Sequence, residues 1–227
     1  MVKALIFDVF GTCVDWRTSV AREVAAALPD VDALAFADAW RGEYQPAMER
    51  IRAGARGYVR LDTLHLENLE IVAGRFGVQA DPDLNAAWEK LDPWPDVVAG
   101  LHAIRDHALI APCSNGSIGL MARLARYGGL PWDCILGADI ARDYKPKLEV
   151  YRASCAALGL SPAEVMMVAA HNDDLVAARE AGLRTGFVPR PTEYGPGQQT
   201  DLSATADWDV VAPDFGVLAQ HISEGLE

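Results

Sequence analysis

The stretch LIFDVFGTCVDW, residues Leu5–Trp16, decides the fold. A short apolar run, Ala4–Phe7, ends directly in Asp8, and Gly11 and Thr12 then break the pattern. An apolar run of this length bounded by turn residues is typical of a buried strand. A carboxylate at the end of such a strand is a candidate nucleophile, although an aspartate that only caps a loop gives the same pattern.

Further apolar runs of strand length alternate with segments of helical period along the chain. These runs are Leu109–Ala111, Val165–Val168, Thr185–Val188 and Asp209–Val211. The alternation predicts an α/β fold with a Rossmann-like open parallel sheet. Ligands of such sheets bind beyond the carboxyl ends of the strands. Asp8, Ser114–Asn115 and His171–Asp174 each follow a predicted strand, so we expect them to meet in one crevice.

Residues 16–90 interrupt this alternation because they have helical periodicity only. The predicted helices are Val20–Leu28, Leu34–Ile51 and Leu61–Phe76, and the stretch Pro93–Pro95 then punctuates the chain. We predict a helical cap domain over residues 16–90, inserted into an α/β core domain of residues 1–15 and 91–227. A cap of this kind closes over a site and excludes water.

Charge and composition exclude several classes of function. The net charge of −12 argues against a nucleic-acid partner, because phosphate binding needs a basic surface. No apolar run approaches the roughly 20 residues of a membrane span. Met1–Lys3 leads directly into the first strand without a signal peptide, so we expect a cytoplasmic protein with no membrane partner. A small anionic substrate would need local cations near the chemistry.

The segment DVFGT, residues 8–12, resembles the first motif of the haloacid dehalogenase superfamily. Three further motifs follow in that superfamily's order and spacing. They are the Ser-Asn pair in APCSNGS (111–117), the Lys-Pro pair in DYKPKLEVY (143–151) and the acidic loop in MVAAHNDD (167–174). The resemblance extends over essentially the whole chain, cap included.

Two departures separate this chain from the phosphatases that dominate the superfamily. Those enzymes carry a second aspartate, which protonates the leaving alcohol, where this chain has Phe10, and a phenyl ring has no proton to donate. They place a magnesium-binding aspartate where alignment through Asp174 puts Ala170. Phosphoryl transfer needs its charge neutralised. The chain instead resembles the type II (S)-2-haloacid dehalogenases, whose leaving halide needs no proton.

This resemblance implies roles for the residues around the leaving group. Asp8 attacks C2 of a short 2-haloalkanoate and forms an aspartyl ester, and the apolar ring of Phe10 shields the site and contacts the substrate. Arg41, in the predicted cap, and Asn115 receive the halide. A solvated helix arginine and an Asn-Gly turn are the alternative interpretations of these two residues.

The substrate carboxylate and the Asp8 rotamer need partners of their own. Ser114 and the backbone N–H groups after Asp8, beginning at Val9, are candidates to hold the substrate carboxylate. Thr12 is a candidate to hydrogen-bond Asp8 and fix its rotamer. Both hydroxyl groups also fit simple loop caps.

The second half of the chain supplies the groups that ionise Asp8 and handle water. Lys145 would keep Asp8 ionised. The family uses a tyrosine near the nucleophile and this lysine, where the chain has Tyr151, although a core aromatic fits that position equally well. By alignment, Asp174 stands where the family has the acid that pairs with this lysine and helps activate water. His171 stands where better-known members have asparagine, and either takes that role or acts as a base.

The reaction implied is hydrolysis of an L-2-haloacid to a D-2-hydroxy acid and halide, without metal or cofactor. A tight halide pocket, helped by His171 or by cap aromatics such as Trp40 and Tyr58, would favour fluoride.

The oligomeric state is open, and a homodimer is favoured by its frequency among oligomers. Two alternatives remain, namely a magnesium-dependent phosphatase or phosphonate hydrolase, and a non-catalytic small-anion-binding protein. The stretch Pro189–Asp201 is interpreted as a surface loop without an assigned role.

Overall fold

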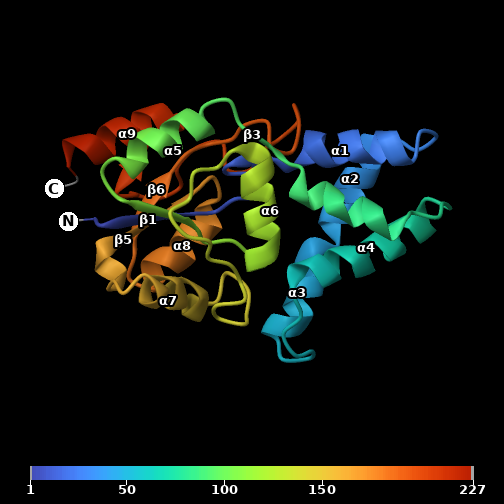
Figure 1. Ribbon diagram of the computed structural model, residues 1–227, viewed down its shortest axis with the longest axis horizontal. Coiled ribbons are helices and arrows are strands. Elements are labelled where there is room, and N and C mark those ends of the chain that lie inside the picture. Colours follow the sequence, from blue (N-terminus) through green and yellow to red (C-terminus); the bar gives the residue numbers. More distant parts are fainter. Residues whose placement is uncertain (1, 226–227) are drawn as a thin grey trace.

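A five-stranded parallel sheet in the order β4-β1-β5-β6-β7 forms the centre of the molecule in the computed structural model, which describes residues 2–225 (Figure 1). The strands are β1 (Ala4–Phe7), β4 (Leu109–Pro112), β5 (Val165–Ala169), β6 (Arg184–Phe187) and β7 (Val210–Val211). The predicted α/β class with an open parallel sheet is confirmed. The outer ends of the predicted core domain, Met1 and residues 226–227, lie outside the described residues.

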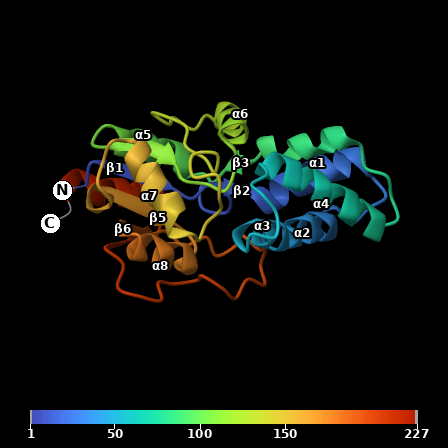
Figure 2. The same cartoon turned by 90° about the horizontal axis from the view of Figure 1, so that it is seen from below.

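Strand β1 lies in the interior of the sheet, and its side chains alternate between two cores. Leu5 and Phe7 belong to one buried cluster, and Ala4 and Ile6 belong to the other. Helices α5 (Val97–Arg105) and α9 (Phe215–Glu224) cover the first face, while α7 (Leu148–Ala157) and α8 (Asn172–Glu180) cover the second (Figure 2). The short 3-10 turn η2 (Pro162–Glu164) leads into β5.

The position of β1 between β4 and β5 explains why the candidate residues converge. Phe7 at its carboxyl end is in register with Pro112 of β4 and Val168 of β5. The residues that follow these three strands therefore leave the sheet at one edge. The backbone N–H of Asp8 still donates to the carbonyl of Val168 at 2.9 Å, so the turn after β1 begins in a fixed position.

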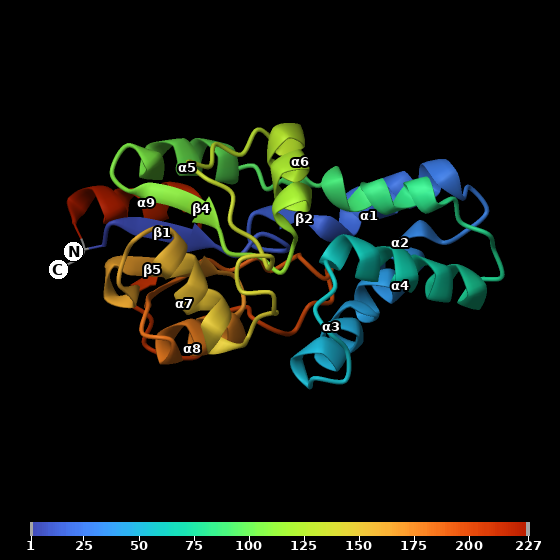
Figure 3. The same cartoon turned by 60° about the horizontal axis from the view of Figure 1, so that its bottom comes forward.

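The segment between the short strands β2 (Val14–Asp15) and β3 (Asp92–Pro93) contains five helices that lie together beyond the carboxyl edge of the sheet (Figure 3). They are α1 (Trp16–Ala27), α2 (Ala33–Gly42), α3 (Tyr44–Arg52), α4 (Leu61–Arg75) and the 3-10 helix η1 (Pro82–Glu89). Strands β2 and β3 are antiparallel and carry the chain into and out of this segment side by side. Helix α6 (Ile118–Gly128) packs against η1 from the core side.

The helices begin where side chains satisfy their free N–H groups. Asp15, near the end of the opening stretch, accepts a 3.1 Å hydrogen bond from the backbone of Thr18 and so caps α1. Asp32, Ser117 and Asp214 do the same for α2, α6 and α9. Each such cap is worth about 1 kcal/mol.

The predicted helix Leu34–Ile51 is wrong as a single helix, because the chain breaks between α2 and α3 at Glu43. Pro46 has no backbone N–H, and its ring would clash with the carbonyl four residues earlier, at Gly42, if one helix continued. The Glu43 N–H instead bonds the Trp40 carbonyl at 3.3 Å in a tighter turn. The break places Arg41 in the last turn of α2.

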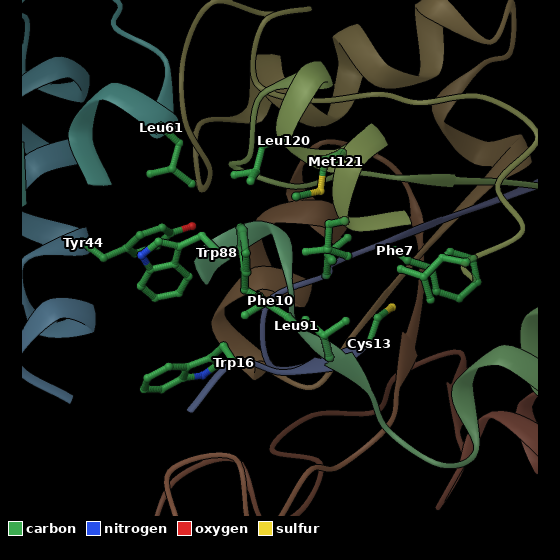
Figure 4. Packing of buried hydrophobic residues seen from close by; sticks show 14 of the residues in the cluster. Phe7, Phe10, Cys13, Trp16, Tyr44, Leu61, Trp88, Leu91, Leu120 and Met121 are labelled. Carbon is green, nitrogen blue, oxygen red and sulfur yellow. The ribbon is translucent and has the colours of Figure 1, made fainter. Parts of the chain in front are cut away.

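An aromatic cluster joins the opening turn to the helical segment (Figure 4). The Phe10 ring meets Trp88 edge-on at a centroid distance of 5.9 Å, and Trp16 stacks on Trp88 at 6.3 Å. Tyr44 also contacts the edge of Phe10, at 6.4 Å. Such pairs add about 0.5–1.5 kcal/mol each beyond their burial. Phe10 is therefore held rigidly between the sheet edge and the helices.

Among the described residues, no helix combines the length and apolarity needed to cross a membrane.

Candidate active site

Asp8 lies at the carboxyl end of β1 with its carboxylate almost fully buried. The Thr12 hydroxyl donates to Asp8 Oδ2 at 2.8 Å and accepts from the Ala170 N–H at 2.9 Å. Gly11, at φ +88°, makes the turn that brings Thr12 back to Asp8. The structure thus gives Thr12 a contact that fixes the Asp8 rotamer.

A buried network of charges joins Asp8 to the second half of the chain. Lys145 donates to Asp8 Oδ1 at 2.8 Å and to Asp174 Oδ2 at 2.5 Å. The Tyr151 hydroxyl donates to the other oxygen of Asp174. The Asn115 side-chain carbonyl accepts from the backbone N–H of Lys145 at 2.8 Å and fixes the backbone of that loop. Lys145 and Tyr151 together hydrogen-bond both carboxylate oxygens of Asp174.

The network keeps Asp8 ionised despite its burial. Burial alone raises the pKa of Asp8, but Lys145 and His171 outweigh it and hold the pKa well below the usual range. Burial lowers the pKa of Lys145, and the two carboxylates Asp174 and Asp8 more than compensate, so the pKa of the ammonium is raised. An ionised, buried carboxylate with little hydration is a capable nucleophile.

His171 connects Asp8 to a residue that the sequence left without a role. Its Nδ1 lies 3.2 Å from Asp8 Oδ2, and its Nε2–H donates to Glu193 Oε2 at 2.8 Å. The indole N–H of Trp16 donates to the other oxygen of Glu193 at 2.9 Å. Burial lowers the pKa of His171, but Glu193 and Asp8 outweigh it and raise the pKa well above its usual value.

Arg41 enters the site from the end of α2. Its guanidinium carbon lies 3.9 Å from the centroid of the Tyr44 ring. Its Nη1 is buried and has no hydrogen-bond partner among the described residues. Arg41, Asp8, Phe10, Asn115 and His171 line one cavity of about 610 Å³ between the sheet edge and the helices. A buried N–H donor without a partner is rare and favours an anion beside it.

Two residues that were expected to bind the substrate, Ser114 and Val9, do not line this cavity. Ser114 is fully buried, and its Oγ accepts from the backbone N–H of Gly116 at 3.1 Å. The Val9 side chain is in the core, and its carbonyl accepts from Cys13 and Val14. Their binding of a substrate carboxylate stays a prediction.

The expectation that Trp40 and Tyr58 help a halide pocket does not fit the structure. Trp40 is fully buried among the helices and donates to the His65 carbonyl at 2.8 Å. Tyr58 donates to Asp139 at 3.0 Å. Neither lines the cavity, whose aromatic residues are Phe10, Tyr44 and Tyr194.

The loop after β6 contributes residues that sequence reasoning missed. Besides Glu193, Arg190 donates to the Thr12 carbonyl at 2.9 Å and forms a two-pronged ion pair with Asp96 at 2.8 and 3.0 Å. Asp201 accepts from the N–H of Asn172 at 2.9 Å and caps α8. The stretch Pro189–Asp201 is therefore part of the site wall. The signal for it was weak, namely charged residues in an otherwise irregular segment.

The position of Ala170 bears on metal binding. Its backbone N–H is committed to Thr12, and its methyl group supplies no ligand. Within residues 2–225, no group of three or more histidine, cysteine or acidic side chains is arranged to hold a metal ion.

Comparison with known proteins assigns the family. Residues 2–182 match the model of the haloacid dehalogenase-like hydrolases. The chain belongs to this family. Among curated proteins, this hydrolase is 29% identical to an (S)-2-haloacid dehalogenase from Xanthobacter autotrophicus over 209 residues, which are 84% of this chain and 76% of the relative.

Two proteins of known structure have a higher sequence identity to this chain. A defluorinating L-2-haloacid dehalogenase is 47% identical to this hydrolase, with a TM-score of 0.96 over 98% of this chain and 95% of that chain. An L-2-haloacid dehalogenase is 44% identical, with a TM-score of 0.96 over 99% of this chain and 100% of that chain. The predicted resemblance to 2-haloacid dehalogenases is confirmed.

Proposed function

We propose that this hydrolase converts short L-2-haloalkanoic acids to D-2-hydroxy acids and halide, through an ester on Asp8. The observation that carries the proposal is the composition of the cavity around Asp8. It pairs an ionised carboxylate with an apolar ring, Phe10, and with the unpartnered N–H of Arg41. This set favours displacement of an anion that needs no proton. The related dehalogenases support the same chemistry.

In the first half of the reaction, a carboxylate oxygen of Asp8 attacks C2 from the side opposite the halogen. The C2–O bond forms as the carbon–halogen bond breaks, so the configuration at C2 inverts. The halide leaves toward Arg41, whose charge and buried N–H stabilise it. The side-chain N–H₂ of Asn115, in the same cavity, is a second donor.

In the second half, water attacks Cγ of Asp8 and releases the hydroxy acid. Lys145 stays beside the Asp8 carboxyl group throughout and stabilises negative charge that develops on its oxygen. Asp174 and Tyr151 fix the lysine. The water oxygen ends in Asp8, and the product carries the oxygen that Asp8 supplied.

The experiment is halide release from L- and D-2-chloropropionate with EDTA present. We expect chloride from the L-enantiomer, and none from Asp8→Asn. Asp106→Asn is the matched control, because Asp106 is exposed at the end of α5 and does not line the cavity. Magnesium-dependent hydrolysis of aryl phosphates without any halide release would overturn the proposal in favour of the phosphatase alternative. Binding of haloacids without any turnover would favour an anion-binding protein.

The assembly state and the location are also proposals. We propose a homodimer, which size-exclusion chromatography with light scattering will test. The cytoplasmic location is proposed from the sequence, and fractionation of the source cells will test it.

A further inference from the structure

The Glu193 carboxylate has a constrained position for a residue in an irregular loop. Its side chain is fully buried, and each of its oxygens accepts one hydrogen bond, from Trp16 and from His171. The loop that carries it is anchored by Arg190, which bonds the carbonyl of Thr12. A Cβ atom on Gly11 would overlap this carboxylate, so the turn after β1 leaves room for it.

Glu193 fixes the orientation of the His171 ring. Because the carboxylate can only accept, the Nε2 of His171 must carry the hydrogen in their 2.8 Å bond. The other ring nitrogen, Nδ1, then faces Asp8 at 3.2 Å. Glu193, His171 and Asp8 are thus connected by successive contacts. In this arrangement an imidazole serves as a general base.

Asp174, the acid that the family resemblance links to water activation, is less suited to take a proton here. Its two oxygens accept from Lys145 and Tyr151, both buried. A water at Cγ of Asp8 would have to displace one of these bonds to reach it. His171 faces the Asp8 carboxyl group directly and needs no such displacement.

We propose that Glu193 is a positioning residue that holds His171 with Nδ1 toward Asp8, so that His171 takes the proton from the water that hydrolyses the aspartyl ester. This inference rests on the proposed function and adds two roles to it. His171 acts on the reacting water, and Glu193 acts through His171.

Protons balance over the cycle if His171 changes charge when Asp8 is esterified. In the free enzyme, the ring lies between the carboxylates of Asp8 and Glu193, which raise its pKa and favour the imidazolium ion. Esterification removes the charge of Asp8, and His171 then releases its proton to solvent. This is the one proton that hydrolysis of a haloacid to hydroxy acid and halide must liberate.

The neutral ring then removes a proton from water as the water oxygen bonds to Cγ and the carbonyl electron pair moves onto the carbonyl oxygen. Collapse of this intermediate breaks the bond between Cγ and the product oxygen, which takes the remaining hydroxyl proton. Asp8 is again a carboxylate, and His171 is again the imidazolium ion.

The other charged or titratable groups on the cavity wall are Arg41, Tyr44, Lys145, Asp173, Asp174, Tyr194 and Asp201.

The test separates ester formation from ester hydrolysis in Glu193→Gln. A glutamine side chain has one accepting oxygen and cannot serve both Trp16 and His171. After rapid mixing with L-2-chloropropionate, we expect a first-turnover chloride burst close to that of the wild type. Ester hydrolysis should fall by about 10²-fold or more, so that intact-protein mass spectrometry finds the adduct on Asp8. Glu180→Gln, an exposed glutamate at the end of α8, is the control and should behave as the wild type.

A pH profile distinguishes this role from simple support of the fold. Ester hydrolysis should fail at low pH, where His171 stays protonated, and Glu193→Gln should move this limb to lower pH because it removes a neighbouring negative charge. In His171→Ala the ester should also accumulate, and added imidazole should speed its hydrolysis. This second variant keeps the test open should Glu193→Gln not fold.

The inference is overturned if burst and hydrolysis fall in parallel in Glu193→Gln, if its ester hydrolysis matches the wild type, or if the acid limb does not move. If one of these results is found while the wild type still releases halide and product, the proposed function stands and only the roles of Glu193 and His171 are lost. Absence of halide release by the wild type itself would remove both.

Discussion

Lys145 donates a 2.8 Å hydrogen bond to Asp8 from a loop 137 residues further along the chain. The pair is buried, with side-chain exposures of 7% and 10%, so water screens it little. The same ammonium bonds Asp174, and one positive charge therefore lies between two carboxylates. The nucleophile stays ionised although it is almost fully buried.

Replacement of this charge should suppress ester formation. In Lys145→Met, Asp8 and Asp174 would face each other without the lysine between them, and the pKa of Asp8 should rise because only His171 then opposes the effect of burial. We expect the first-turnover halide burst to fall by about 10-fold or more near neutral pH and to recover as the pH is raised, because the ionised fraction of Asp8 falls tenfold for each unit by which its pKa exceeds the pH. Rapid-quench halide assays measure this. Lys147→Met, which removes a half-exposed lysine bonded to Asp143, should leave the burst unchanged.

The same pair should govern acid stability. The pKa of Asp8 is lowered in the folded protein, so its ionisation stabilises the fold above the unfolded-state pKa of about 4. This contribution is lost progressively as the pH falls below that value. Urea unfolding at several acidic pH values should therefore give a steeper loss of free energy of unfolding for the wild type than for Asp8→Asn. Equal slopes would contradict an ionised Asp8 in the folded state.

Arg41 should control how readily the halide leaves. Loss of a hydrogen bond from a charged donor costs about 1.5–3 kcal/mol, so kcat/KM of Arg41→Met should fall by about 10- to 100-fold. Inhibition by added bromide should weaken in parallel, because the same N–H receives the product halide. Arg50→Met removes an exposed arginine of α3 and is the control. A variant with slower turnover but unchanged bromide inhibition would place the halide elsewhere.

Two glycines with left-handed backbone allow a paired comparison of strain and function. Gly11 has φ +88° and Gly182 has φ +97°, and alanine at either position should cost about 1–3 kcal/mol of stability. At Gly182 an added Cβ makes only an ordinary contact with Pro162, whereas at Gly11 it overlaps the Glu193 carboxylate. Gly11→Ala should therefore also slow ester hydrolysis, measured by single-turnover kinetics. Equal rates of ester hydrolysis in the two variants would show that the close approach of Gly11 to Glu193 does not affect this step.

The part of the fold that could be predicted is the part with a periodic pattern. Four of the five sheet strands are apolar runs, and Asp8 could be placed because a carboxylate directly follows one of them. The break at Glu43 was missed, although Pro46 signals it, because the apolar period continues across it. Ser114 was expected to face a ligand, but a hydroxyl group shows no preference in sequence between a ligand and the backbone N–H it bonds.

The loop after β6 could not be predicted for a different reason. Glu193 and Arg190 find their partners, Trp16 and Thr12, about 177 and 178 residues away in the sequence. No local period records contacts of this kind, and an irregular segment with glycine and proline resembles any exposed loop. His171 was recognised as a departure from the family, but its orientation depends on Glu193 and was visible only in three dimensions.

The central claim, that Asp8 attacks carbon and forms an ester, is tested most directly by a single turnover in heavy-oxygen water. Enzyme in excess over L-2-chloropropionate should give a product whose new hydroxyl oxygen is unlabelled, because Asp8 supplied it. The label should appear in the peptide that contains Asp8, once per turnover. Heavy oxygen in the product of the first turnover, with none in Asp8, would mean that water attacks the substrate directly and would contradict the account.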